Sequence, residues 1–337
     1  MNKRRKNVTI EQIANRVGVC KSTVSKALSN ATDVNEQTRV KIISTAAELG
    51  YTVRRNAEKH KNSVSVYVYN INSSTVNRFA NELILGFQTA ASESNFSVNV
   101  VNISSLELST GSYCDNLTYS KSKGYFFIGF PPHERFIDAA ERKSIPFVIF
   151  EDYVNSALAV EIGYDNSICY KILINHLVRL GHRKIAFLGG EQTSRITSSR
   201  EIAFINAMTD NNLRVYRKMF AYGSYFGTFN KSDIIDLIDN GATAIVCASD
   251  GLANETVKAC QSVGLRVPTD VSITGFDGLA FTKYTNPPLT TIFQNRIQIG
   301  KSAFHLIQQI NSGVRLTKLS FRAELIARES TSEHIEK

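Results

Sequence analysis

The hydrophobic residues of this chain follow two different spacings. In the first fifty residues they recur every three or four positions, which is the spacing of one face of an α-helix. From residue 63 onward, short runs of β-branched and aromatic residues alternate with further helical patterns. Because strands that alternate with helices form parallel βαβ units, the pattern predicts a small helical domain followed by an α/β domain.

The first helix is predicted to begin directly after Thr9. Thr9 and Gln12 form a capping box, in which the hydroxyl and the side-chain amide satisfy backbone N–H groups at a helix start. Ile13 and Val17 then lie on one hydrophobic stripe. Gly18 tolerates the left-handed backbone that ends a helix, so the first helix should end there.

A second short helix is predicted close behind the first. Val24, Ala27 and Leu28 have helical spacing and should face inward. The outward face then carries small polar and basic side chains, namely Lys21, Ser22, Ser25, Lys26 and Ser29. A third helix is predicted from Asn35, a good N-cap, to a stop at Gly50.

Two short helices joined by a turn with Gly form the unit that places a recognition helix in the major groove of DNA. Bulky exposed residues would block entry into the groove, whereas the outward face of the second helix is short, polar and basic. An ordinary helical hairpin with a solvated face has the same pattern, so these residues alone leave both interpretations open.

The α/β region contains enough strands for two doubly wound lobes. Strands are predicted around Val64, Val66 and Val68 and at 96–103, 124–130, 146–150, 184–188, 244–248 and 271–275. Helices are predicted at 79–91, 167–180, 200–211, 232–240 and 252–263. Ligands of such folds bind at the carboxyl ends of the strands, where the loops converge.

Positive charge is concentrated in one fifth of the chain. Residues 1–62 carry 13 Lys/Arg against five Asp/Glu, a net charge of +8, whereas the rest carries 26 against 25. A compact basic domain joined to a nearly neutral one is typical of a head that binds nucleic-acid phosphates. A solvated face or a membrane-surface segment would carry the same charge.

Other features narrow the setting of the protein. No secretory signal and no run of 18 hydrophobic residues is visible, which predicts a soluble cytoplasmic protein. The cysteines are odd in number and widely scattered, and are expected to be reduced thiols: Cys20, Cys114, Cys169, Cys247 and Cys260. Neither cysteine nor histidine spacing suggests a metal site, and no cofactor is expected.

The first fifty residues carry a series of short motifs almost without gaps. They are Val8-Thr9-Ile10, Ile13-Ala14, Val17-Gly18-Val19, Ser22-Thr23-Val24-Ser25-Lys26-Ala27-Leu28-Ser29-Asn30, Thr38-Arg39 and Leu49-Gly50-Tyr51. In this order they resemble the helix-turn-helix head of the lactose-repressor (LacI/GalR) family of transcription regulators. The resemblance implies a sequence-specific DNA-binding protein.

The resemblance also implies roles for individual residues of the head. By position, Lys21, Ser22 and Lys26 should contact base edges. The positions that should contact phosphates or anchor the helices are Thr9, Thr23, Ser25, Asn30 and Arg39. Cys20 stands at the N-cap where the family usually has Ser, and because sulfur is a weak acceptor, about 1 kcal/mol of capping should be missing.

The rest of the chain resembles the effector domain of the same family. The motifs include Gly163-Tyr164-Asp165-Asn166, Leu180-Gly181-His182-Arg183-Lys184-Ile185-Ala186, Gly275-Phe276-Asp277, Pro287-Pro288-Leu289-Thr290-Thr291-Ile292 and Leu325-Ile326-Ala327-Arg328-Glu329-Ser330. The resemblance implies a fold like a periplasmic binding protein, with three crossovers between two lobes. The expected division is a head at 1–52, a hinge linker at 53–62, an N-lobe at 63–164 and 295–323, and a C-lobe at 165–294 and 324–331, all of 63–337 serving effector binding and dimerisation.

Five positions match the effector contacts of that family. They are Glu151, Arg200, Ser249, Asp277 and Gln294. Carboxylate acceptors together with a forked guanidinium donor can bind vicinal hydroxyls, so the expected effector is a sugar or a sugar derivative. On the residues alone, Arg200 with Glu201 could instead be a surface charge cluster, and Asp277 could cap a turn.

The hinge linker departs from its family. Most members have a Pro where this chain has Val53, an Arg where it has Glu58, and a Leu where it has His60. In those members the Leu wedges into the minor groove at the operator centre, which a polar imidazole can do only poorly. We therefore expect Arg54, Arg55 and His60 to contact DNA mainly through phosphates and to bend it less.

These inferences together predict a homodimeric repressor that binds a pseudo-palindromic double-stranded operator and responds to a small molecule. An activator of the same fold remains an alternative, because the sign of regulation depends on operator position. A solute-binding protein would be expected to carry a secretory signal and no basic head. An enzyme is disfavoured because the phosphate-binding and nucleophile motifs of doubly wound enzymes are missing.

Overall fold

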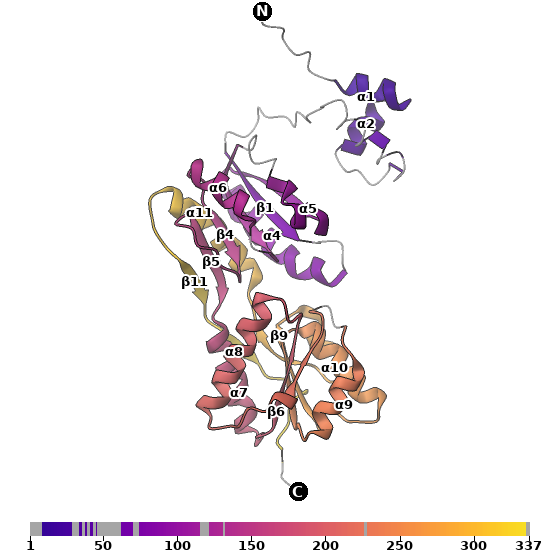
Figure 1. The fold of residues 1–337 in the computed structure, drawn as a ribbon, viewed down its shortest axis with the longest axis vertical. Coiled ribbons are helices and arrows are strands. Elements are labelled where there is room, and N and C mark those ends of the chain that lie inside the picture. Colours follow the sequence, from indigo (N-terminus) through magenta and orange to yellow (C-terminus); the bar gives the residue numbers. More distant parts are fainter. Residues whose placement is uncertain are drawn as a thin grey trace, which may run out of the picture. The chain divides into compact units, whose positions relative to one another are not determined.

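The computed structural model describes residues 9–28, 34–35, 38, 41–42, 45, 62–69, 74–114, 121–130, 132–225 and 228–334. The chain forms two compact units, Met1–Lys61 and Asn62–Lys337 (Figure 1). The fold class is as the sequence predicts: a helical head and two parallel-sheet lobes.

The head begins with the capping box that its sequence predicts. The Thr9 N–H donates to Gln12 Oε1 at 2.8 Å, and the Gln12 N–H donates to Thr9 Oγ1 at 3.3 Å. Helix α1 (Ile10–Val17) follows and ends at Gly18, whose φ of 78° is left-handed. Helix α2 (Lys21–Leu28) comes next, so both predicted helices are confirmed.

A small hydrophobic core joins the helices of the head. Ile13 and Ala14 of α1 pack against Val24 and Ala27 of α2, and all four side chains are buried. Of the third predicted helix, the described residues are helical at Thr38, Lys41, Ile42 and Thr45. The predicted helix positions Val40, Ile43, Ala47 and Leu49 lie outside the described residues.

The first lobe, here called the N-lobe, is built on a six-stranded sheet in the order β11-β5-β4-β3-β1-β2. Its strands are all parallel: β1 (Ser63–Tyr69), β2 (Ser97–Ile103), β3 (Ser122–Ile128), β4 (Phe147–Phe150), β5 (Ala159–Tyr164) and β11 (Lys318–Phe321). Its helices are α4 (Ser74–Glu93), α5 (Ser105–Thr110), α6 (Glu134–Arg142) and α11 (Arg296–Asn311).

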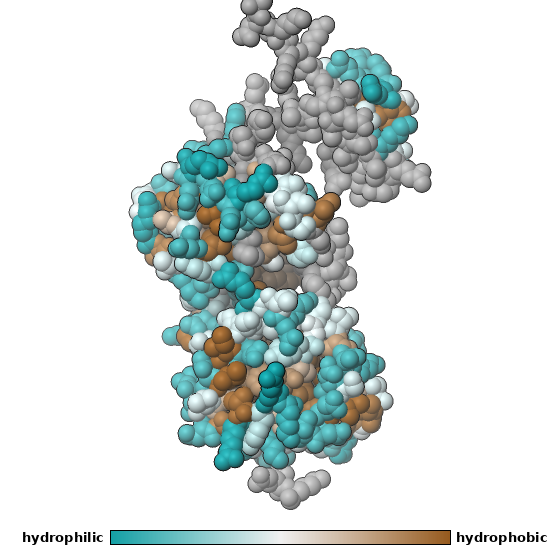
Figure 2. Space-filling view, in the orientation of Figure 1, coloured by the Kyte–Doolittle hydropathy of each residue, from teal (hydrophilic) through white to brown (hydrophobic). Residues whose placement is uncertain are grey.

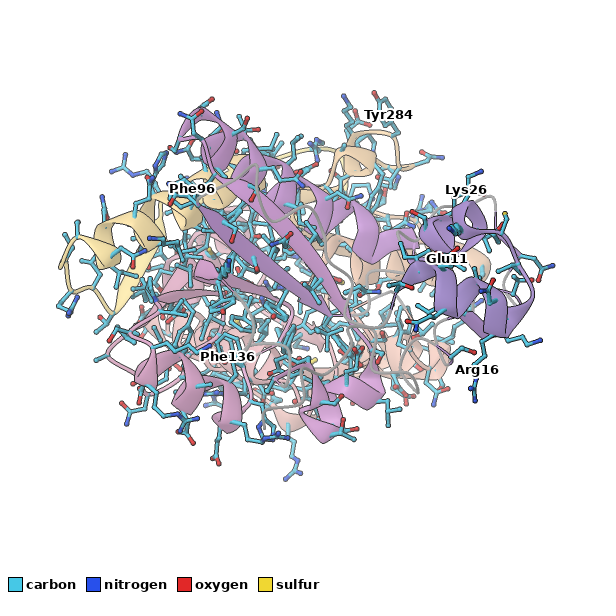
Figure 3. All side chains as sticks on the ribbon, turned by 90° about the horizontal axis from the view of Figure 1, so that it is seen from above. Glu11, Arg16, Lys26, Phe96, Phe136 and Tyr284 are labelled. Carbon is cyan, nitrogen blue, oxygen red and sulfur yellow. The ribbon has the colours of Figure 1, made fainter. Side chains whose placement is uncertain are left out.

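Two glycines let α4 and α11 approach each other closely. A Cβ added at Gly86 would lie 2.0 Å from the Ile297 carbonyl oxygen, and one added at Gly300 would lie 2.0 Å from the Leu83 carbonyl oxygen. On another part of the N-lobe, α6 inserts Phe136 among aromatic side chains, with its ring centroid 4.6 Å from that of Phe127 (Figure 3). The N-lobe therefore owes its core to side chains far apart in sequence.

The second lobe, the C-lobe, has its own six-stranded sheet in the order β12-β10-β9-β8-β6-β7. Its strands are β6 (Ile185–Gly189), β7 (Phe220–Tyr222), β8 (Ala244–Cys247), β9 (Ser272–Asp277), β10 (Thr290–Phe293) and β12 (Glu324–Ile326), of which β12 runs antiparallel to β10. Its helices are α7 (Asn166–Arg179), α8 (Arg195–Asp210), α9 (Lys231–Asp239) and α10 (Asp250–Ser262). The chain passes between the two sheets after β5, after β10 and after β11.

Helix α8 begins earlier than the sequence predicts. The hydrophobic periodicity predicts a start at residue 200, whereas the helix starts at Arg195, after an N-cap Ser194 that makes no side-chain capping hydrogen bond. Residues 195–199 contain β-branched and Ser residues, which are weak helix formers, so the extra turns come from tertiary packing. Within those turns Thr197 is fully buried.

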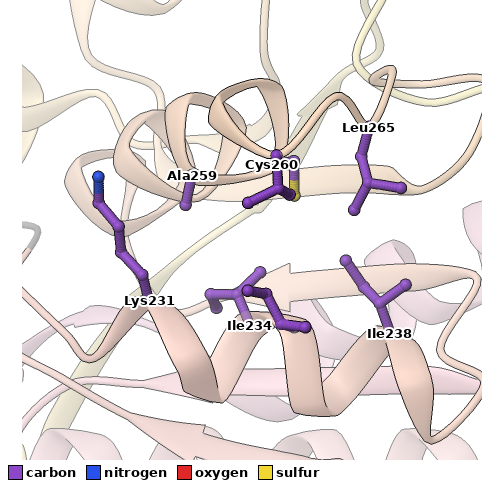
Figure 4. A pocket seen from close by; sticks show the side chains of 8 residues that line it. Lys231, Ile234, Ile238, Ala259, Cys260 and Leu265 are labelled. Atoms are coloured by element: carbon purple, nitrogen blue, oxygen red, sulfur yellow. The ribbon is translucent and has the colours of Figure 1, made fainter.

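The surface of the C-lobe is mostly hydrophilic, with hydrophobic residues exposed over α7 and α8 (Figure 2). A small apolar crevice separates α9 from α10 (Figure 4). Its lining residues are Lys231, Ile234, Ile235, Ile238, Ala259, Cys260, Val263 and Leu265. Among the described residues, no helix is both long and apolar enough to cross a membrane.

Residues 332–334 contact the C-lobe at a buried histidine. His182 Nδ1 lies 2.9 Å from Thr243 Oγ1, and its Nε2 lies 3.0 Å from Ser272 Oγ and 3.1 Å from the Ser332 carbonyl oxygen. The ring of His334 stacks on that of His182, with centroids 5.4 Å apart. Burial lowers the pKa of His182 to about 4, although the Ser332 carbonyl opposes this change.

This arrangement predicts that acid destabilises the C-terminal unit. The folded-state pKa of His182 lies below the unfolded value of about 6.5, so its contribution to stability is complete above pH 6.5 and is lost as pH falls toward 4. Urea denaturation should show a loss of about 2 kcal/mol between pH 7.5 and pH 5. His182→Gln should remove that part of the pH dependence, whereas the exposed His305→Gln should retain it. An unchanged pH profile in His182→Gln would contradict this account.

Candidate functional site

The outward face of α2 presents the side chains that the sequence assigns to DNA. Lys21, Ser22, Ser25 and Lys26 are exposed, and Thr23 is half-buried. Lys21 Nζ forms an ion pair with Glu11 Oε1 of α1 at 2.7 Å. The remaining predicted DNA contacts, Asn30, Arg39, Arg54, Arg55 and His60, lie outside the described residues, as does the hinge linker that departs from the family pattern.

Cys20 stands directly before α2 and contacts two hydroxyls of its first turn. Its Sγ lies 3.0 Å from Ser22 Oγ and 2.9 Å from Thr23 Oγ1. These hydrogen bonds, that of Ser22 first, lower the pKa of Cys20 to about 7. The Cys20 carbonyl accepts from the Val24 N–H at 3.2 Å, as the residue before a helix should.

A second group of predicted residues meets where the two lobes face each other. Arg200 of α8 donates from Nη2 to Glu151 Oε2 at 2.9 Å, and the same nitrogen lies 3.9 Å from Asp277 Oδ1. The other terminal nitrogen of Arg200 donates to the Ala248 carbonyl. The side chains of Arg200 and Glu151 are only 3% and 4% exposed, so this ion pair is shielded from water.

Glu151 brings the N-lobe into this cluster. It directly follows β4 and has a left-handed φ of 51°. Its Oε1 accepts a hydrogen bond from Gln294 Nε2 at 2.9 Å, and Gln294 directly follows β10 of the C-lobe. Gly163 leaves room for this, because a Cβ there would lie 2.8 Å from Glu151 Cγ. The cluster therefore forms at the carboxyl ends of strands from both sheets, where doubly wound folds bind ligands.

Asp277 is the last residue of β9 and is buried in the same cluster. Its φ of 118° is unusual for a residue with a side chain, and Arg296 donates to its carbonyl oxygen. Burial raises the pKa of Asp277 to about 7, while Arg200 and Arg296 oppose the shift and Glu151 adds to it. The neighbouring Asp250 is also fully buried, and burial followed by the charge of Asp277 raises its pKa.

Ser249 joins the cluster only through a neighbour. Its hydroxyl accepts from the Leu252 N–H at 3.1 Å, which caps α10, and donates to the Tyr225 carbonyl at 3.1 Å. Tyr225 in turn lies beside Arg200, whose guanidinium carbon is 5.6 Å from its ring centroid. The Ser249 hydroxyl is therefore already engaged within the protein.

Sequence reasoning missed two residues of this site. The ring of Tyr225 packs directly against Gly190. A side chain at position 190 would leave no room for it, since a Cβ there would lie 2.2 Å from the ring. The Gly189-Gly190 pair at the end of β6 was the signal that another group approaches the backbone closely there. Arg296 at the start of α11 is also buried, and its Nε donates to Glu82 Oε2 at 2.9 Å. No pattern in the sequence marks Arg296 as a buried cation.

The site combines charged donors and acceptors with aromatic walls. The Arg200 guanidinium lies 4.1 Å from the centroid of Phe276, within range of a cation–π interaction. Among the described residues, Arg200 Nε and Gln294 Oε1 are buried polar atoms without a hydrogen-bond partner. Such atoms normally bind water or a ligand, so the cluster can accept further polar groups.

The fold and these two sites define a DNA-binding transcription regulator with a ligand-binding domain like a periplasmic binding protein. The family model described as bacterial regulatory proteins, lacI family, matches residues 9–53. The model described as a periplasmic binding protein-like domain matches residues 174–331. The chain thus carries the DNA-binding domain of the LacI family of bacterial regulators together with a periplasmic binding protein-like domain, as its motifs indicate.

Relatives of known name match over nearly the whole chain. The transcriptional repressor CytR of Escherichia coli K12 is 26% identical over 332 residues, which are 96% of each chain. The complex of the regulator CelR with cellobiose superposes with a TM-score of 0.71 at 20% identity, covering 96% of this chain and all of that one. The Lac repressor dimer bound to operator and the anti-inducer ONPF gives 0.70 at 22% identity, covering 97% and 100%.

The buried ion pair predicts an asymmetric response to mutation. Glu151→Ala should destabilise the C-terminal unit by about 3–5 kcal/mol, because it leaves the buried Arg200 charge without its principal partner. The double variant Glu151→Ala/Arg200→Met should recover most of that loss, since an apolar side chain no longer needs a counter-ion. Urea denaturation measures both.

A neighbouring ion pair between the lobes provides the control. Arg195 Nη1 lies 3.2 Å from Asp152 Oδ1, but the Arg195 side chain is largely exposed to water. Asp152 is 11% exposed and its partner can be replaced by water, so Arg195→Ala should cost less than Glu151→Ala. If Glu151→Ala lowers the free energy of unfolding no more than Arg195→Ala does, the buried ion pair does not stabilise the C-terminal unit more than the exposed one.

Proposed function

We propose that this protein is a homodimeric cytoplasmic repressor whose affinity for its operator is changed by a carbohydrate effector bound between the lobes. The observation that carries the proposal is the cluster of Arg200, Glu151, Asp277 and Gln294, which is contributed by both lobes. A ligand that bonds to both sides of this cluster changes the relative stability of lobe arrangements, which is how binding shifts a conformational equilibrium.

A polyhydroxylated ligand suits the chemistry of the cluster. The two carboxylates of Glu151 and Asp277 accept hydrogen bonds from hydroxyls, and the Arg200 fork donates to them. The unpartnered Arg200 Nε and Gln294 Oε1 supply one further donor and one further acceptor. Phe276 and Tyr225 provide apolar surface for the faces of a sugar ring. The related CelR structure contains cellobiose, which supports a carbohydrate of some kind.

Dimerisation follows from the small size of the head. A single eight-residue recognition helix reads too few bases for a unique site, so two heads on a pseudo-palindrome are required. The related Lac repressor is a dimer on its operator, and the relative CytR is named a repressor. Exposed hydrophobic residues on α4 and β2, Leu85 and Val100, offer apolar surface for a subunit contact in the N-lobe.

The effector site is tested by thermal shift and operator binding on the full chain. Screening sugars, sugar phosphates and nucleobases should give a ligand that stabilises the protein by about 2.7 kcal/mol at 100 times its Kd. Asp277→Asn should abolish both the shift and the change in operator affinity while leaving operator binding without ligand near normal, because Asp277 lies outside the head. Glu201 lies next to Arg200 in the sequence but accepts a hydrogen bond from Tyr222. Glu201→Gln should therefore respond to the ligand as wild type does. A full response in Asp277→Asn would place the effector elsewhere.

The DNA contacts are tested by comparing specific and random duplexes. Lys21→Ala and Lys26→Ala should each weaken operator binding by about 1–3 kcal/mol for a lost base contact, with a smaller effect on random DNA. Arg39→Ala should weaken binding to both duplexes alike, because a phosphate contact reads no sequence. Equal losses on both duplexes for all three variants would refute the division into base readers and an anchor.

A further inference from the structure

Lys21 is the first residue of the recognition helix, and it is engaged by an acidic residue of the neighbouring helix. Its Nζ lies 2.7 Å from Glu11 Oε1. Glu11 lies in the first turn of α1, at the opposite end of that helix from Arg16 (Figure 3). The two side chains are 62% and 60% exposed, so the pair faces water. Sequence analysis gave Glu11 no role.

The position of each charge on its helix explains why the pair forms. A helix N-terminus carries a partial positive charge, so a carboxylate in the first turn of α1 is favourable. A lysine in the first turn of α2 is unfavourable for the same reason. Glu11 therefore offsets the repulsion between Lys21 and the N-terminus of α2, and it holds the Lys21 ammonium group at a defined place.

We propose that Glu11 tunes the operator affinity of the DNA-binding head by acting as an exchangeable counter-ion for Lys21. On random DNA, Lys21 stays paired with Glu11 and does not neutralise a phosphate. On the operator, the acceptors of a guanine replace Glu11 as the partner of Lys21. This inference rests on the proposed role of Lys21 as a base reader.

The energies allow such an exchange. An exposed ion pair contributes about 0.2–1 kcal/mol, whereas a good contact to a guanine edge discriminates by about 1–3 kcal/mol. The operator contact is therefore strong enough to take Lys21 from Glu11. A single phosphate offers Lys21 little beyond what Glu11 already provides.

Operator binding must break the ion pair, so Glu11 lowers the operator affinity by the energy of that pair. Removing its charge should strengthen operator binding by that energy and binding to random DNA by no more, because Lys21 stays with Glu11 on random DNA only when a phosphate is the weaker partner. An energy of 0.2–1 kcal/mol corresponds to an affinity change of about 1.4- to 5-fold. The newly available lysine should also release about one more counter-ion from random DNA, which steepens the log–log salt slope by about 0.9.

The experiment uses the full chain, an operator selected from a random duplex pool by the wild-type protein, and a random duplex of the same length. Affinities are measured over a series of salt concentrations for wild type, Glu11→Gln, Lys21→Ala and the double variant. Asp210→Asn is the matched control, because Asp210 pairs with Lys171 at 3.2 Å with side-chain exposures of 55% and 59%. Asp210→Asn changes the net charge by the same amount as Glu11→Gln, but Asp210 lies outside the head.

Glu11→Gln should bind the operator about 1.4- to 5-fold more tightly with an unchanged salt slope, and random DNA more tightly by no larger a factor with a steeper slope, whereas Asp210→Asn should behave as wild type. In the Lys21→Ala background, Glu11→Gln should have no further effect on the slope. Glu11→Asp, which keeps the charge, should retain most of the wild-type operator affinity. Thermal denaturation of each variant separates a folding defect from these effects.

Three results would overturn the proposal. One is an operator affinity that Glu11→Gln leaves unchanged, which would mean that the operator does not take Lys21 from Glu11. Another is a slope change that persists without Lys21. The third is a loss of preference at one base pair in Glu11→Gln that persists without Lys21, which would make Glu11 a reader of cytosine. If Lys21→Ala itself leaves specificity intact, the proposed function of Lys21 fails, and that result is distinct from the other three.

Discussion

The buried ion pair between Arg200 and Glu151 constrains the whole C-terminal unit. A guanidinium that is almost inaccessible to water is tolerable only when a carboxylate and further acceptors surround it. That requirement places the end of β4, the middle of α8 and the residue after β10 within hydrogen-bonding distance of one another. Since β4 belongs to one sheet and α8 packs on the other, the pair also fixes how the two lobes meet.

The same cluster supplies the chemistry of ligand recognition. Burial makes each of its hydrogen bonds more costly to leave unmade, so a ligand that completes the set gains more there than on an open surface. Arg296 on the other side of Asp277 links α11 of the N-lobe to β9 of the C-lobe, and it makes the cluster a junction between lobes as well as a site. Ligand binding and lobe arrangement therefore depend on the same few groups.

The charges of the head, in contrast to those of the lobes, are exposed to water. Its side chains stay in water, each ion pair is weak, and exchange of partners is easy. The net charge of +8 in residues 1–62 attracts any DNA, so selectivity depends on contacts to base edges that only the operator provides. Strong buried pairing in the lobes and weak exposed pairing in the head thus match the two tasks of the chain.

The two helices of the head, the likeness to the LacI family, the fold class and four residues of the cluster could all be inferred from the sequence alone. Capping, periodicity and motif order are local, so they can be identified without coordinates: the box at Thr9 and the stop at Gly18 are examples. The packing in three dimensions was needed to show that α8 begins at Arg195, that Ser249 is engaged by Tyr225, and that Arg296 is buried beside Asp277. It also decided that Glu11 meets Lys21. These depend on which side chains approach across helices and sheets, and no spacing along a single element records a contact whose partners lie on different ones.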